Sequence, residues 1–244
     1  MTAYPTTFFG WVGLLLDNYG PLLLRGTWVT MVIALSGTVI GFIIGLLTAV
    51  VRTVPLKGRK WFVRLPMRLA TLLINVYIEV FRGTPMIVQS MVIFYGAMMI
   101  GLIGRRTPVL PVAILIVSIN TGAYMAEIVR GGIISVDKGQ KEACAALGMT
   151  HWQSMVHVIL PQAVRRLLPA SVNLATRIVK TTSLATLLGV VEVIKVGQQI
   201  IDAHRFDYPA GTLWVYGVIF AMYFVVCWPL SMAARYLEKR WANE

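Results

Sequence analysis

Long apolar stretches separated by short polar segments make up most of this chain. A helix of about 20 apolar residues is long enough to cross the hydrocarbon core of a bilayer. Stretches of about that length occur at residues 27–51, 86–104, 109–129, 181–201 and 212–234. The pattern predicts an all-α integral membrane protein in which residues 1–244 form a single domain with about five transmembrane helices.

Two apolar segments are too short to be spans, and one span is interrupted by charges. We expect residues 8–16 to lie along the membrane interface. Residues 69–80 are expected to lie along the cytoplasmic face and to lead into the second span. Glu192 and Lys195 interrupt the fourth span, and their i, i+3 spacing predicts an ion pair that cancels its own charge.

The first span carries glycine at every fourth position, at Gly37, Gly41 and Gly45. This spacing of small residues permits another helix to approach closely, either within the subunit or across a dimer interface. The alternative is the general tolerance of glycine in helices surrounded by lipid. The pattern leaves both interpretations open.

The one long polar, helix-forming insert covers residues 137–169. Asp137 can cap its first short helix, and Gly148 can adopt the left-handed conformation that ends a helix. Thr150 and Gln153 have capping-box spacing, which predicts the start of a second short helix. The insert therefore interrupts the membrane-like pattern with structured, polar chain.

Two further features of the insert predict its shape and its use. Because Pro161 has no N–H group, the second short helix is expected to stop near Leu160 and a third to begin at Pro161. Ala143, Ala146 and Leu147 share one face of the first short helix, and small residues let another surface approach its backbone. This face is suited to docking in a groove.

Basic residues predict the orientation of the chain in the membrane. Six of them follow the first span, with no acidic residue before Glu79: Arg52, Lys57, Arg59, Lys60, Arg64 and Arg68. Such clusters mark the cytoplasmic side, which places the amino terminus outside and the carboxyl terminus inside. Alternation then places Arg105, Arg106 and Arg205 outside, and the insert with Arg235, Lys239 and Arg240 inside.

Composition indicates a membrane protein and argues against a nucleic-acid-binding protein or a disulfide-rich protein. The chain is 57% hydrophobic and 13% charged, with a formal net charge of +12. The basic residues lie at the ends of apolar segments, so this charge reflects membrane orientation rather than nucleic-acid binding. Cys144 and Cys227 lie in the insert and in an apolar span, and we expect no disulfide.

No residue pattern predicts an enzyme. The chain has no Gly-x-x-x-x-Gly-Lys-Ser/Thr loop to hold the phosphates of ATP. His151, His157 and His204 lack the spacing of metal ligands, so we expect no metal site. The sequence presents no catalytic constellation of Ser, His and acid either. If ATP and Mg²⁺ are used, they are expected on a partner.

A polar stripe on the third span is the leading candidate for a substrate path. Asn120, Tyr124 and Glu127 recur at i, i+4 and i+7 and share one helix face, which is expected to avoid lipid. Arg130 follows Glu127 by three residues and can pair with it. Glu127 then either contacts substrate or forms a structural ion pair, and the sequence leaves both alternatives open.

A second set of polar residues surrounds the start of the second span. Glu79 and Arg82 flank a Gly-Thr-Pro segment, where Pro85 can begin a helix. We expect either an ion pair and a structural kink or a helix start that attracts a carboxylate. Gln89 and Ser90 are weaker candidates of the same kind.

The insert resembles the cytoplasmic EAA loop of ABC-importer permeases. Glu142, Ala143, Gly148, Leu160 and Pro161 match that motif, while Cys144 and Val158 stand where Ala and Ile are usual. The runs VFRGTP at 80–85 and AYMAEIVRGG at 123–132 are similar to the branch that imports polar amino acids, of the histidine, glutamine and arginine type.

The resemblance implies the type I ABC-importer permease fold in a bacterial inner membrane. It also implies partners: ABC ATPase subunits that bind the insert, a second permease subunit, identical or homologous, and a periplasmic or extracellular amino-acid-binding protein. Two other classes are weighed against it. One is an ion-coupled secondary transporter that would use Glu127, Glu192 and Lys195, and the other is a membrane assembly protein without transport.

Overall fold

The computed structural model describes residues 7–54, 60–104, 106–204 and 211–242, and within these ranges every regular element is a helix. Lys57, Arg59, Arg105 and Arg205, which entered the orientation argument, lie outside the described residues. The α-helices are α1 (Phe8–Thr53), α2 (Trp61–Gly83), α3 (Met86–Met99), α4 (Val109–Ile134), α5 (Lys138–Ala146), α6 (His151–Ser154), α7 (Leu160–Thr181), α8 (Val193–Ala203) and α9 (Gly211–Ala242). A π-helical turn, η1 (Met155–Ile159), and a 3₁₀ helix, η2 (Thr182–Leu188), complete the elements.

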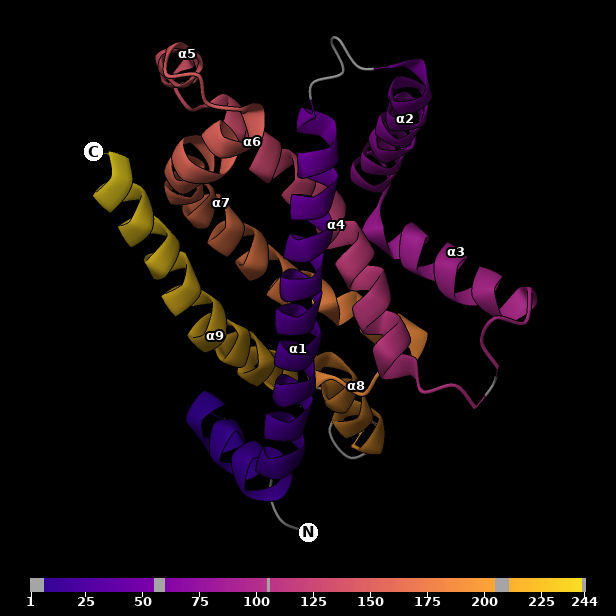
Figure 1. The fold of residues 1–244 in the computed structure, drawn as a ribbon. Coiled ribbons are helices and arrows are strands. Elements are labelled where there is room, and N and C mark those ends of the chain that lie inside the picture. Colours follow the sequence, from indigo (N-terminus) through magenta and orange to yellow (C-terminus); the bar gives the residue numbers. More distant parts are fainter. Residues whose placement is uncertain (1–6, 55–59, 105, 205–210, 243–244) are drawn as a thin grey trace.

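Helix α1 is longer than the first predicted span, because it is continuous over 46 residues. Thr7 caps it by accepting a hydrogen bond from the Gly10 N–H, and Pro21 lies within it. Residues 8–16, which were predicted to lie along the membrane interface, form the first turns of this helix, and their place at the interface stays a prediction. Trp11 and Leu15 are buried in a cluster with residues of α8 and α9, in the part of α1 that turns aside at the lower end of Figure 1.

Helices α1 and α4 pack in very close contact along the middle of the bundle. A Cβ atom built on Gly37, Gly41 or Gly45 would lie 2.5–2.6 Å from side-chain atoms of α4. The facing residues are Val117, Thr121 and Met125. The glycines therefore serve a contact within the subunit, which is the first of the two alternatives.

The second predicted span, residues 86–104, is longer than the helix that the structure has there. Helix α3 ends at Met99, after 14 residues, and Gly101 follows with a φ of 75°. The apolar segment expected to lie on the cytoplasmic face is instead part of α2, which is long and apolar enough to cross a membrane. Pro85 separates α2 from α3, so the apolar pattern on its two sides belongs to different helices.

The fourth predicted span, residues 181–201, is not one straight helix. They comprise η2, a turn at Gly189 with a φ of 94°, and most of α8. The helices 151–188 and 193–203 are bent by 52° relative to each other. Among the described residues, four helices can cross a membrane alone, namely α1, α2, α4 and α9, and this bent pair is the fifth candidate.

The insert has the predicted caps and an unpredicted continuation. Asp137 accepts a hydrogen bond from the Gly139 N–H, Gly148 has a φ of 71°, and both halves of the Thr150/Gln153 capping box are formed. A boundary falls at Leu160, where α7 begins with Pro161 in its first turn as predicted, but the chain stays helical across it, which was not expected. The turn widens to η1, where the Leu160 N–H reaches the Met155 carbonyl, and α7 then continues beyond the predicted limit at residue 169 to Thr181.

The α1–α4 contact yields a stability prediction. Gly41→Val should destabilise the protein by about 1–3 kcal/mol, because the new side chain meets Thr121 and the backbone of Gly122. Gly13→Val, on the same helix with no atom within 4 Å of its added Cβ, is the control. The midpoint of thermal unfolding in detergent measures both, and equal midpoints would contradict the close contact.

Candidate functional site

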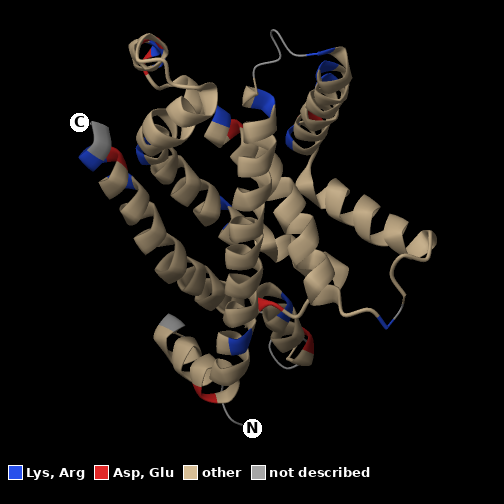
Figure 2. Ribbon diagram, in the orientation of Figure 1, with Lys and Arg blue, Asp and Glu red and all other residues tan. Residues whose placement is uncertain are grey.

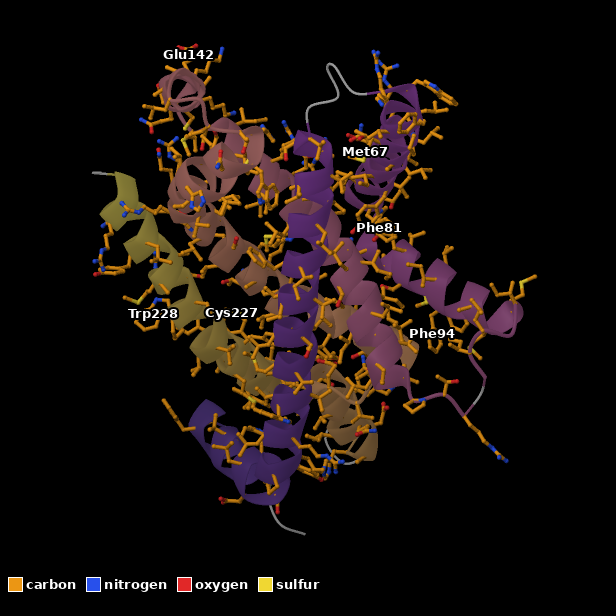
Figure 3. The ribbon with its side chains drawn as sticks, viewed as in Figure 1. Met67, Phe81, Phe94, Glu142, Cys227 and Trp228 are labelled. Atoms are coloured by element: carbon orange, nitrogen blue, oxygen red, sulfur yellow. The ribbon has the colours of Figure 1, made fainter. Side chains whose placement is uncertain are left out.

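The first short helix of the insert, α5, presents a small apolar face to the outside. Ala143, Ala146 and Leu147 are all exposed, and Leu147 is 80% exposed. Cys144, the residue that departs from the EAA pattern, is buried on the opposite side. Figure 3 shows Glu142 on α5, at the outer end of the structure. The face predicted to dock is therefore accessible.

The turn after α5 has the hydrogen bonds of a Schellman motif. The Met149 N–H donates to the Cys144 carbonyl and the Gly148 N–H donates to the Ala145 carbonyl, each at 3.0 Å. Nothing lies within 4 Å of a Cβ built on Gly148, so its backbone conformation, not space, favours glycine here. This turn fixes the angle between α5 and α6.

The other two predicted coupling residues, Leu160 and Pro161, lie at the start of α7. Leu160 is half-buried and packs against the core, whereas Pro161 is exposed. Side-chain hydrogen bonds also connect α7 to the chain before it. Gln162 donates to Gln140 of α5 at 3.1 Å, and Arg166 donates to the carbonyl of Ser135. The insert is thus tied to α7 as well as continuous with it.

Glu127 of α4 is the centre of an ion-pair cluster built from three helices. Its carboxylate lies 2.5 Å from Arg52 of α1, 2.7 Å from Arg130 of α4 and 3.9 Å from Arg82 of α2. The predicted pair with Arg130 is present. The sequence reasoning missed Arg52 as a partner, because it treated that residue only as a marker of orientation.

The expected pair between Glu79 and Arg82 is not formed. Arg82 turns toward Glu127 and lies 5.9 Å from the ring centroid of Tyr124, while Glu79 is exposed and makes no ion pair with any described residue. On an α-helix these two positions can meet, but Glu127 is only 17% exposed, so water screens its attraction for Arg82 less than it screens that of the exposed Glu79. Arg177 of α7 also lies over Tyr124, at 3.8 Å.

Asn120, the remaining stripe residue, is 3% exposed and belongs to a hydrogen-bond network between helices. It donates to Gln89 of α3 at 2.7 Å. Gln89 donates in turn to Thr84 and to the carbonyl of Phe81, which is labelled in Figure 3, near the end of α2. Gln89, the weaker sequence candidate, is therefore central to the packing around Pro85.

The expected ion pair between Glu192 and Lys195 is wrong. Glu192 is completely buried and caps α8, accepting a hydrogen bond from the backbone N–H of Lys195 at 3.0 Å. The hydroxyl groups of Thr186 and Thr30 also donate to it. Hydroxyl and backbone donors satisfy the carboxylate, so it needs no ammonium group. Within the described residues, no three His, Cys, Asp or Glu side chains gather as a possible metal site.

Comparisons with known proteins identify the family of this architecture. Residues 41–243 match the model of the binding-protein-dependent transport system inner membrane component. The chain belongs to that family. The family's members include membrane permeases, and neither a secondary transporter nor an assembly protein is supported for this chain.

Several relatives are permeases of amino-acid transporters. The chain is 37% identical to the glutamine transport system permease protein GlnP of Escherichia coli (strain K12) over 220 residues, 90% of this chain and 93% of that protein. It is 32% identical to the L-cystine transport system permease protein TcyB of Bacillus subtilis (strain 168) over 224 residues, 92% and 88% of the two chains.

Solved structures agree with the fold. An amino acid ABC transporter crystallised with histidines has a chain that is 31% identical, with a TM-score of 0.80, covering 93% of this chain and 97% of its own length. The inward-facing MetNI methionine ABC transporter is 22% identical with a TM-score of 0.67, and covers 89% and 95%. At 22% identity, the similarity to the methionine transporter shows a shared fold alone. The type I importer permease fold expected from the sequence is confirmed.

The ion-pair cluster yields a second prediction. Glu127→Gln should lower the free energy of unfolding by about 1–3 kcal/mol, because Arg52 and Arg130 lose a charged acceptor. Glu79→Gln removes an equal charge from an exposed position and is the control. The midpoint of thermal unfolding without denaturant and the amount of permease in the membrane measure the difference between the two variants. If the two variants are equally stable, the cluster does not hold these helices together.

Proposed function

We propose that the chain is one of two permease subunits of an importer that moves a polar amino acid across a bacterial inner membrane. A soluble binding protein delivers the amino acid, and two ABC ATPase subunits, which hold ATP and Mg²⁺, drive the movement. The observation that carries this proposal is the exposed face of α5, where Leu147 is 80% exposed beside two alanines. The similarity to amino-acid permeases supports the substrate class.

The insert is positioned to pass movement from an ATPase to the membrane helices. Helix α6, η1 and α7 follow one another without an intervening loop, and Gln140 and Ser135 bind α7 from the side. A displacement of α5 therefore reaches α7, which packs against α4 and α9. Glu142, Ala143, Ala146 and Leu147 form the docking surface, Gly148 sets its angle, and Leu160 and Pro161 begin the helix that receives the movement.

The orientation follows from where the basic residues gather. In Figure 2 the blue residues at the end of α1, along α2, on α5 and near the end of α9 lie toward one end of the bundle, opposite the end where α1 begins. Basic residues favour the cytoplasmic side. We therefore assign this end to the cytoplasm and the start of α1 to the outside.

The substrate path lies along the solvent-exposed part of the polar stripe, around Tyr124. Asn120 is buried against α3, whereas Tyr124 remains half-exposed, with the exposed Arg82 and Arg177 near its ring. Guanidinium groups bind carboxylates well, and a free amino acid carries one. Two such subunits would enclose a polar path that one subunit with so few spans could not.

Coupling is tested at Gly148. Gly148→Val forces a β-branched residue into a left-handed conformation at a cost of about 1–2 kcal/mol or more, which should turn α5 away from its docking angle. In vesicles containing the co-purified ATPase, uptake per ATP hydrolysed should fall severalfold. Gly148→Asn, which tolerates this conformation, should retain most coupling. Normal coupling in Gly148→Val with normal assembly would refute the proposal.

Recognition is tested at Arg177. Arg177→Gln should raise the KM for uptake roughly tenfold or more, because a charge-assisted hydrogen bond to the substrate carboxylate is lost. Lys180→Gln, which removes an exposed charge one turn further along α7, should leave KM nearly unchanged. Concentration-dependent uptake of labelled amino acid by reconstituted vesicles distinguishes the two. An unchanged KM in Arg177→Gln would remove this residue from the path.

A further inference from the structure

A cleft of about 690 Å³ lies between the insert and the membrane helices, at the end we assign to the cytoplasm. Its volume is in the range of sites that bind small molecules. Residues from α1, α2, α4, α5, α6 and η1 line it, so it connects the coupling insert to three of the helices below. It is separate from the docking face of α5 and from the surface around Tyr124.

The two faces of α5 have different surroundings. Lys141 and Ala145, four residues apart on α5, line the cleft, and Met149 lines it beyond the turn at Gly148. Ala143, Ala146 and Leu147 do not line it. An ATPase docked on Ala143, Ala146 and Leu147 therefore leaves Lys141 and Ala145 facing the cleft. A solute bound in the cleft would contact this second face of α5.

The cleft is rich in cationic hydrogen-bond donors. Arg52, Arg130 and Lys141 line it, and no Asp or Glu is among its described lining residues. Glu127, which lies beside the cleft, accepts hydrogen bonds from Nη1 of Arg52 and from Nε and Nη2 of Arg130. One carboxylate cannot balance these arginines together with Lys141, so positive charge remains.

Donor groups also remain available on both arginines. Within the described residues, Nε and Nη2 of Arg52 and Nη1 of Arg130 make no hydrogen bond. Glu127 holds each guanidinium in place by its other nitrogen atoms, which reduces the entropy cost of using the spare ones. The arrangement is suited to a carboxylate.

One residue that lines the cleft, Asn75 of α2, has a buried acceptor without a donor. Oδ1 of Asn75, from α2, is buried and accepts no hydrogen bond from any described residue. A buried amide oxygen without a partner is costly, and an ammonium group can satisfy it. The hydroxyl groups of Thr53, Thr71 and Ser154, which line the same cleft, already donate to backbone carbonyls and so keep their oxygen atoms free to accept.

We propose that this cleft binds a free α-amino acid from the cytoplasm, with its carboxylate at Arg52, Arg130 and Lys141 and its ammonium group at Asn75. Spare cationic donors and an unpaired acceptor in one cleft match a zwitterion better than a simple anion. The bound solute would bridge α5 to α1, α2 and α4 and restrain the insert. This site goes beyond the transport path, and its occupancy can be measured without transport.

Protection of a cysteine in the cleft tests the proposal. Ala145→Cys would be made in the permease–ATPase complex with Cys144 and Cys227 replaced by alanine, and held in phosphatidylcholine nanodiscs. L-glutamine should slow maleimide labelling of this cysteine severalfold in a saturable manner. Lys141→Glu should weaken that protection roughly tenfold or more, because a cationic donor becomes an anion.

Lys138→Glu is the matched control, since it reverses an exposed charge on the same helix outside the cleft. Protection by L-glutamine should be unchanged in this variant. Asn75→Leu should also weaken protection, since it removes the acceptor for the ammonium group. No protection by L-glutamine, or equal protection in the Lys141→Glu and Lys138→Glu variants, would overturn the proposal.

Two further probes separate the zwitterion from other oxyanions. Acetate carries only the carboxylate, and nanodiscs containing phosphatidylglycerol offer an anionic lipid headgroup. Neither should protect Ala145→Cys at concentrations where L-glutamine does. Equal protection by acetate or by phosphatidylglycerol would overturn the assignment of an amino acid, because the cleft would then recognise negative charge alone.

Discussion

The close contact between α1 and α4 determines how the polar groups of this permease are arranged. Gly37, Gly41 and Gly45 bring the backbone of α1 against Val117, Thr121 and Met125. With the axes this close, the end of α1 carries Arg52 to within 2.5 Å of Glu127. Any larger side chain along the glycine row would separate the axes, and the ion-pair cluster beyond Gly45 would lose a member.

Charged groups inside the bundle are satisfied in two different ways. Glu127 is 17% exposed and is surrounded by arginines from three helices. Glu192 is completely buried and takes its hydrogen bonds from Thr30, Thr186 and the start of α8. Both solutions meet the requirement that ionisable groups at membrane depth find polar partners. The Glu127 cluster joins helices near the insert, and the hydrogen bonds of Glu192 fix the bend before α8.

The insert and the membrane part of the protein form one mechanical unit. The π-helical turn η1 accommodates Pro161 without ending the helix, so α6 and α7 remain connected. A helix break there would have left the insert on a flexible joint. The cleft behind α5 lies at this connection, which is why a solute bound in it would act on coupling.

Local chemistry let the sequence by itself determine several features. The caps at Asp137 and Thr150, the left-handed Gly148 and the pairing of Glu127 with Arg130 each depend on residues within a few positions of one another, and all are present. The spans at α1 and α4 followed from long, uninterrupted apolar runs. The EAA pattern indicated the permease family, which the comparisons confirm.

Only the tertiary structure decided the remaining features, because they depend on residues far apart in the chain. Hydropathy measures the length of an apolar run but not where a helix turns. Residues 69–80 were therefore predicted to be too short for a span although they belong to the longer α2, residues 86–104 were expected to form a longer helix than α3, and the bend between η2 and α8 was missed. Arg52 and Glu127 are 75 positions apart and Asn120 and Gln89 are 31 apart. Their pairing requires the packing of α1 and α3 against α4, which no local pattern encodes.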